Sequence, residues 1–185
     1  MEPLAEESQV SLGMAFKVKQ LLDDREWFRR EPDGFRLGAP AELLSDWAAS
    51  YRYGRNRVRE YFSLDPVPQI EAKLPDVCQR ICNYALTGFS AAARMAPMVR
   101  YQKAAVYVLG PIDQVAQGLG LKRVDTGANV NLIDPYDEGV LFGASEVDGI
   151  RVASALQTYL DLLNVRGRGE EAAEAVLEQV IKPSW

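Results

Sequence analysis

Apolar and polar positions near the N-terminus follow first a helical and then a strand-like pattern. Ser11 is a good N-cap for a helix reaching about Glu26, and a short helical stretch covers residues 4–8. The apolar positions of the longer helix recur with a 3.6-residue period: Met14, Val18, Leu21 and Leu22. Residues 27–30, the turn Pro32-Asp33-Gly34 and residues 35–37 then predict a β-hairpin. The order helix, strand, turn, strand is typical of a recognition helix and its wing.

The remainder of the chain alternates short helical and strand-like segments. Helices are expected over 41–50, 69–84, 91–95, 111–119, 155–164 and 169–181, with Ser90 and Ser154 as N-caps. Strands are expected over 104–109, 121–124, 129–133, 139–142 and 149–152. Residues 58–64 fit either a strand or a helix end, and residues 85–88 are expected to form a turn.

This pattern predicts an α+β fold, in which a partial winged helix-turn-helix precedes a mixed α/β domain that ends in two helices. We expect three parts: residues 1–38 for the winged helix, 39–68 for a helix and linker, and 69–185 for the α/β domain. The winged helix is expected to be partial because only Met1-Glu2-Pro3 precedes Leu4, where such a domain needs a first helix. Glu26 stands at a turn where glycine is common in such folds.

Composition narrows the classes of function. The 185 residues are 48% hydrophobic, which supports a real core, and no apolar run approaches the roughly 20 residues of a membrane-spanning helix. No secretory signal is recognised, and Cys78 and Cys82 lie four residues apart, which indicates packing in a reducing cytoplasm. The absence of histidine excludes Ser-His-Asp and Cys-His catalysis and removes the commonest zinc ligand.

An enzyme would therefore depend on other side chains, and we expect no catalytic residue, metal or cofactor. Asp134, Asp137 and Glu138 follow a strand and could hold magnesium in a nucleotidyltransferase-like enzyme. Pro135 indicates an ordinary turn there instead. We rank this enzyme below the other interpretations.

The net charge of −5 fits nucleic-acid binding poorly as a whole, so the distribution of charge matters more. Residues 61–185 carry 11 Lys and Arg against 15 Asp and Glu, a balance of −4. Residues 52–59 contain a basic cluster of four arginines: Arg52, Arg55, Arg57 and Arg59.

The predicted winged helix contains residue types suited to DNA. The N-terminal part of a recognition helix contacts base edges, where Gln20 could pair with adenine, and Lys17 could neutralise phosphate. The candidate DNA-binding residues on the helix and wing are Ser11, Gly13, Lys17, Lys19, Gln20, Arg29, Arg30 and Arg36. The alternative is that helix and hairpin serve only for packing, in a protein-interaction module that does not bind DNA.

Several segments together resemble the AbiEi family of antitoxins, named after the abortive-infection E system. Residues 84–92 (YALTGFSAA) and 126–135 (TGANVNLIDP) resemble the opening segment and central strand of that family's C-terminal domain. Residues 152–163 (VASALQTYLDLL) and 167–174 (GRGEEAAE) are similar to the family's ending and are the most specific. Lys17-Val18 and the Leu43-Leu44, Trp47 and Tyr51 pattern resemble its winged helix, so the resemblance covers nearly the whole chain.

The resemblance implies a bacterial, cytoplasmic transcriptional regulator of a type IV toxin–antitoxin system. Its N-terminal domain would bind operator DNA and repress its own operon. Residues 69–185 would act as antitoxin to a nucleotidyltransferase toxin without necessarily forming a stable complex, and no membrane would be involved. The motif residues of this domain are Gln157, Tyr159, Asp161, Arg168 and Glu171. Asp161 and Arg168 could pair across the turn at Gly167 in a buried contact between the last two helices, or the motif could form a partner surface.

Overall fold

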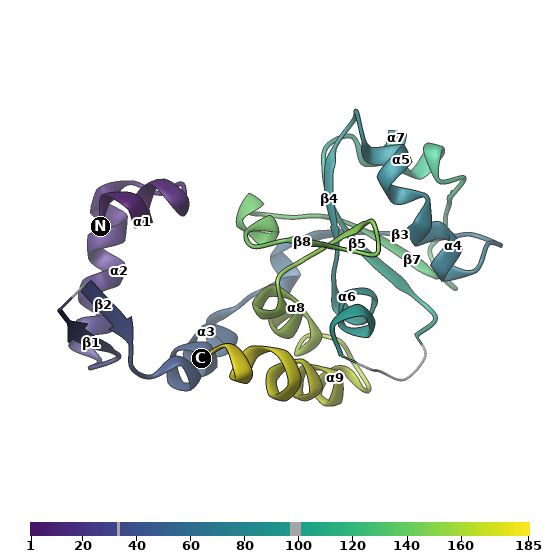
Figure 1. Ribbon diagram of the computed structural model, residues 1–185. Helices are drawn as coiled ribbons and strands as arrows, with labels where there is room; N and C mark the ends of the chain where they lie inside the picture. The colour runs from purple at the N-terminus through teal and green to yellow at the C-terminus, as the bar shows by residue number, and fades with distance from the viewer. Residues whose placement is uncertain (33, 97–100) are drawn as a thin grey trace. The chain divides into compact units, whose positions relative to one another are not determined.

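The computed structural model describes residues 1–32, 34–96 and 101–185, which form two compact units (Figure 1). Unit 1 comprises residues 1–51 and unit 2 comprises residues 52–185. The sequence-based division ends the first part at residue 38 and starts the last at residue 69. The structural division differs from the sequence-based one because the helix after the hairpin joins unit 1, and residues 57–62 form a strand of unit 2.

Unit 1 consists of helices around a small hairpin. Helices α1 (Glu2–Glu7) and α2 (Leu12–Asp24) precede strands β1 (Phe28–Glu31) and β2 (Gly34–Leu37), and helix α3 (Pro40–Ser50) follows. The hydroxyl of Ser11 caps α2 by accepting a hydrogen bond from the backbone N–H of Met14 at 3.2 Å. The two strands are antiparallel, with Arg29 opposite Arg36 and Arg30 opposite Phe35. Asp33 of the expected turn lies outside the described residues.

The helix over α2 is confirmed, but its apolar stripe does not face a core. Met14, Val18 and Leu21 are 47–50% exposed, whereas the buried residues of α2 are Ala15 and Leu22. The reason is size: a 51-residue unit has little interior, and small domains bury a low fraction of their surface.

Glu26, at the position where glycine is common in winged helices, has a left-handed backbone in the turn into the hairpin. Its φ of 58° lies in the left-handed region, which costs a non-glycine residue roughly 1–2 kcal/mol. A glycine would adopt this conformation without that cost.

Unit 2 is built on a seven-stranded mixed sheet with the strand order β6-β3-β7-β5-β4-β9-β8 (Figure 1). The strands are β3 (Arg57–Phe62), β4 (Asn83–Leu86), β5 (Ala104–Leu109), β6 (Lys122–Arg123), β7 (Val130–Asp134), β8 (Ser145–Val147) and β9 (Ile150–Val152). Neighbours β4/β9 and β5/β7 are parallel, and the other pairs are antiparallel.

Helices cover both faces of this sheet (Figure 1). On one face, α4 (Val67–Ala72), α5 (Leu74–Cys78) and α7 (Ile112–Gly118) pack against Leu86, Val106 and Leu132 in the main core. On the other face, α6 (Gly88–Met95), α8 (Ala155–Leu162) and α9 (Gly169–Val176) pack against one another. The chain after α9 continues as a π-helical turn and ends in a 3-10 turn.

The close packing of α8 and α9 explains one glycine of the quoted motif. A Cβ atom at Gly169 would lie 2.3 Å from the backbone oxygen of Leu162, the last residue of α8. Only glycine therefore permits the two helices to meet this closely at their turn.

Four local expectations were wrong: a helix, a turn, a strand and an N-cap. The expected helix over 69–84 and turn over 85–88 are instead α4, α5 and strand β4, whose apolar residues pair with β5 and β9. The expected strand over 139–142 is a 3-10 helix capped by Asp137. Ser90 does not cap α6, because Thr87 occupies the N-cap position, and the Ser90 hydroxyl instead accepts a hydrogen bond from the backbone of Ala105. The ambiguous segment after residue 57 is the strand β3.

Candidate functional site

One face of α2 presents the polar candidates for DNA contact to solvent. Gly13, Lys17 and Gln20 are exposed and follow helical spacing, on the side opposite the buried Ala15 and Leu22. A Cβ atom at Gly13 would meet no other atom within 4 Å, so the backbone is open there to close approach. We call Gly13, Lys17 and Gln20 the α2 polar face. Asp24, also exposed, lies at its C-terminal end.

The cations of unit 1 divide into paired and unpaired groups. Lys19 forms an ion pair with Asp23 and lies 4.6 Å from the centre of the Phe35 ring, so it faces the hairpin. Arg36 lies 3.8 Å from a carboxylate oxygen of Glu31, and Arg25 pairs with Asp46 at 2.6 Å. For the remaining three cations, Lys17, Arg29 and Arg30, the described part of the chain contains no ion pair.

The hairpin distributes its arginines over two faces. Arg29 and Arg36 are directly opposite each other in the register and therefore share one face. Arg30 is opposite Phe35 and shares the other face with Phe28, whose ring centre is 5.9 Å from that of Phe35. Lys19 of α2 lies over the Phe35 ring on that same face, where Arg30 is exposed to solvent.

The structural division changes where the negative charge lies. Unit 1 carries six Lys and Arg against ten Asp and Glu, a balance of −4, whereas unit 2 carries fifteen against sixteen, a balance of −1. The balance of −4 found for residues 61–185 in the sequence analysis depends on counting from residue 61, which leaves out four arginines of unit 2. The basic cluster Arg52, Arg55, Arg57 and Arg59 belongs to unit 2 instead. Any DNA contact by unit 1 therefore relies on local cations rather than on its net charge.

A buried polar cluster joins α8 to the sheet of unit 2. Asp161 is 1% exposed, and its carboxylate accepts a hydrogen bond from the Gln157 amide at 3.0 Å and a shared one from the Tyr107 hydroxyl, whose oxygen lies 2.8 and 2.9 Å from the two carboxylate oxygens. The Thr87 hydroxyl also donates to this carboxylate. Residues from α8, β5 and the start of α6 thus converge on one carboxylate, as buried charges require.

Tyr53, in the 3-10 turn Tyr53–Arg55 before β3, lies close to the same cluster. It packs against Tyr107, Ile133 and Val140. Burial, and then the charge of Asp161, raise the pKa of the Tyr53 phenol above its ordinary value. The phenol therefore stays protonated next to the carboxylate.

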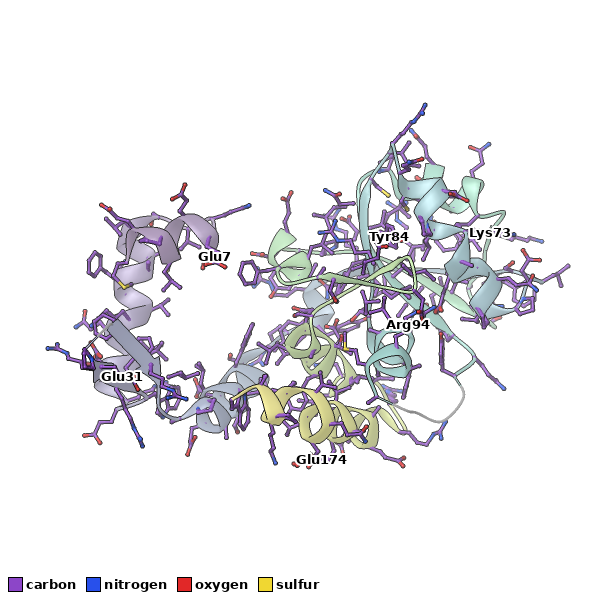
Figure 2. All side chains as sticks on the ribbon, in the orientation of Figure 1. Glu7, Glu31, Lys73, Tyr84, Arg94 and Glu174 are labelled. Atoms are coloured by element: carbon purple, nitrogen blue, oxygen red, sulfur yellow. The ribbon has the colours of Figure 1, made fainter. Side chains whose placement is uncertain are left out.

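The other motif residues occupy different places. Tyr159 is half-buried, and its pKa is raised by burial and by the charge of Glu174, an exposed residue of α9 (Figure 2). Glu171 is exposed in the first turn of α9. Arg168 lines a surface pocket with Phe89 and Tyr101. The hydrogen bonds described above for Asp161 come from other residues, so its pairing with Arg168 stays a prediction.

A second buried charge in unit 2 is paired with an arginine of α6. The Glu71 side chain of α4 is fully buried, and its carboxylate lies 2.9 Å from the guanidinium of Arg94, which extends from α6 (Figure 2). The Tyr101 hydroxyl donates to the same oxygen at 2.8 Å. Glu71 and Arg94 were not singled out from the sequence, because a lone charge in a helical segment normally indicates a solvated face.

The acidic turn after β7 has other roles than metal binding. Asp137 accepts a hydrogen bond from the Gly139 N–H at 2.7 Å, and Asp134 pairs in register with Arg57. Within residues 1–32, 34–96 and 101–185, no group of three or more acidic or cysteine side chains is arranged to hold a metal ion. No described helix is both long and apolar enough to cross a membrane.

The sequence of this chain matches one known protein family. The family of transcriptional regulators described as AbiEi antitoxins of type IV toxin–antitoxin systems matches residues 36–182. The chain belongs to the AbiEi family. The match covers β2 in part, α3 and nearly all of unit 2, whereas α1, α2 and β1 lie outside it. Comparisons with curated proteins and with solved structures find no match.

As a member of this family, the chain is classed as a transcriptional regulator and antitoxin. The description of the family is that of a regulator and antitoxin. The buried cluster of Asp161 and the α8–α9 turn both fall inside the matched region. The candidate DNA-binding residues fall outside it except for Arg36.

Proposed function

We propose that this AbiEi protein binds operator DNA through unit 1 as a winged helix and counteracts a nucleotidyltransferase toxin through unit 2. The observation that carries the DNA-binding part is the α2 polar face, which precedes a β-hairpin in the chain order of a recognition helix and wing. In this proposal, Lys17 and Arg30 neutralise phosphate and Gln20 contacts a base edge.

The N-cap of α2 offers a test that separates DNA binding from helix stability. Aspartate caps a helix about as well as serine, so Ser11→Asp retains α2 while placing a negative charge at the end that would face phosphate. We expect the variant to fold normally and to lose binding to the DNA upstream of its own gene, measured by mobility shift at low salt.

Ser154 provides the matched control, because its hydroxyl caps α8 of unit 2 with the same 3.2 Å hydrogen bond. Ser154→Asp adds the same charge at a helix N-cap that belongs to unit 2 and should leave the mobility shift unchanged. Equal binding by the Ser11→Asp variant and the wild type would contradict a DNA contact at this end of α2.

The antitoxin part of the proposal is supported by the match over residues 36–182, which contains most of unit 2. Co-expression with a nucleotidyltransferase toxin encoded beside its gene tests it. The Ser11→Asp variant should protect cell growth as the wild type does, because unit 2 is unchanged. Loss of protection in that variant would show that the two functions are not divided between the units.

One observation favours a second function, a protein-interaction module without DNA binding. Unit 1 has a balance of −4, and Met14, Val18 and Leu21 expose an apolar stripe on α2. Exposed apolar side chains next to one another mark interaction surfaces in soluble proteins. Absence of any mobility shift by the wild type at low salt, where phosphate contacts are strongest, would favour this function.

A further inference from the structure

A pocket of about 370 Å³ opens on unit 2, where three segments meet. Phe89 comes from the start of α6, the residues just before β5 contribute a second wall, and the turn between α8 and α9 contributes two arginines. The lining residues are Phe89, Tyr101, Gln102, Lys103, Arg166 and Arg168. None of them lies in unit 1, so the site is independent of the α2 polar face.

The charge of the lining is of one sign. Among the lining residues that the structure describes, three are cations and none is a carboxylate, although unit 2 as a whole has more acidic than basic residues. The other pockets described differ: one in unit 1 is lined by Glu42 and Asp46, and one in unit 2 combines Lys73 with Asp65 at 2.6 Å. Guanidinium groups present planar sets of donors that match phosphate oxygens.

Hydrogen bonds from inside the protein fix Tyr101, one of the two aromatic side chains that line the pocket. The Tyr101 hydroxyl donates to the buried carboxylate of Glu71 at 2.8 Å, and the Arg94 guanidinium donates to that hydroxyl at 3.4 Å. Phe89 is half-buried on the other element. Aromatic side chains beside a cationic groove stack on nucleic-acid bases, so rings that are fixed before binding favour a base without a further ordering cost.

Lys103, which lines the pocket, already forms an ion pair within the protein. Its ammonium lies 2.6 Å from a carboxylate oxygen of Glu60 on β3, and both side chains are partly exposed. An anion in the pocket would therefore compete with Glu60 for Lys103.

We propose that this pocket binds a free mononucleotide, with Arg166, Arg168 and Lys103 contacting its phosphate and Phe89 and Tyr101 its base. The volume lies at the small end of the roughly 300–1,000 Å³ of ligand pockets, which suits one nucleotide. The inference goes beyond operator binding and assigns a small-molecule ligand to the antitoxin unit.

Calorimetric titration of the full chain with purine and pyrimidine nucleoside monophosphates tests the proposal. Arg166→Ala should weaken binding about tenfold, the size of one lost charge-assisted contact. Glu60→Gln should instead tighten binding several-fold, because Lys103 is released to the ligand. Lys122→Ala, an exposed cation outside the pocket, is the control and should change nothing.

Inorganic phosphate and a single-stranded oligonucleotide serve as the comparison probes. Tighter binding of monophosphates than of inorganic phosphate, reduced in Phe89→Leu, supports the base contact. Absence of monophosphate binding, equal binding of inorganic phosphate, or binding of the oligonucleotide alone would each overturn the proposal. Circular dichroism of each variant confirms that it is folded. Because every changed residue lies in unit 2, failure here leaves operator binding by unit 1 a separate question.

Discussion

The single hydroxyl proton of Tyr107 is shared by the two carboxylate oxygens of Asp161, which lie 2.8 and 2.9 Å from the hydroxyl oxygen. Both residues are almost completely buried, so a charged group ties α8 to the central strand β5. The arrangement satisfies a carboxylate that would be costly to bury alone. It also explains why part of the AbiEi motif is polar on the buried side of α8.

Removing the Tyr107 hydroxyl tests this tie. Tyr107→Phe takes a donor from a buried carboxylate, so we expect the free energy of unfolding in urea to fall by about 1–3 kcal/mol. Tyr136→Phe, at an exposed tyrosine of the same unit, should change it by less than about 0.5 kcal/mol. Equal stability of the two variants would contradict a structural role for the Tyr107–Asp161 bond.

The Glu71–Arg94 pair should behave as one energetic unit. Breaking a buried ion pair by removing one partner leaves an uncompensated charge and costs about 3–5 kcal/mol. We expect such a loss in Glu71→Gln and in Arg94→Met, measured by urea unfolding. The double variant should lose clearly less than the sum of the two, because no unpaired charge then remains. Additive losses would show that the two side chains do not depend on each other.

Glu26→Gly should stabilise the hairpin of unit 1. Glycine adopts the φ of 58° at this position without the steric cost borne by glutamate, so we expect a gain of about 1 kcal/mol. Amide hydrogen exchange of residues 27–38 in the full chain measures it locally. Asp24→Gly removes the same charge from the end of α2, where glycine instead weakens the helix. Faster exchange in Glu26→Gly would contradict strain at this turn.

We expect the free energy of unfolding to fall at alkaline pH because of the raised pKa of the Tyr53 phenol. The pKa of this phenol is raised above its ordinary 10.0 in the folded protein, by burial and then by Asp161. Above pH 10 the unfolded chain therefore loses a proton that the folded chain keeps. The stabilisation is complete below that pH and is lost as pH rises towards the folded pKa, by at most about 1.4 kcal/mol per pH unit.

Tyr53→Phe should make this decline shallower, measured by urea unfolding at several pH values from neutral to alkaline. The difference between wild type and variant at neutral pH gives the effect of the lost hydroxyl alone and serves as the internal control. Parallel declines of the two proteins above pH 10 would show that Tyr53 does not contribute.

Local sequence patterns predict much of the secondary structure of this chain. The strand over 104–109 appears at those residues. A run of six consecutive apolar residues is typical of a strand that is buried in a sheet. The pattern fails at β4, whose residues continue an apolar helical spacing and become a strand only through pairing with β5 and β9. Long-range pairing of this kind leaves no local trace.

The candidate sites were predicted less completely than the fold. Gln157 and Asp161 stood out through the resemblance, but their partners Thr87 and Tyr107 are distant in sequence, and no local pattern links them to the helix that contains Gln157 and Asp161. Lys19 was grouped with Lys17 as a phosphate contact, yet the two point to different sides of α2 because they are two residues apart. In both cases, the contacts of a side chain depend on which residues lie close to it in the fold, and residue type alone does not predict them.

The most direct test of operator binding is the salt dependence of affinity for the DNA upstream of the gene, measured by fluorescence anisotropy. Each phosphate neutralised contributes a slope of about −0.9 in log affinity against log salt. We expect the double variant Lys17→Ala/Arg30→Ala to bind more weakly and to reduce the slope by about 2. Lys122→Ala/Arg123→Ala removes two exposed charges from unit 2 and should match the wild type. An unchanged slope in the Lys17/Arg30 variant would contradict operator binding through unit 1.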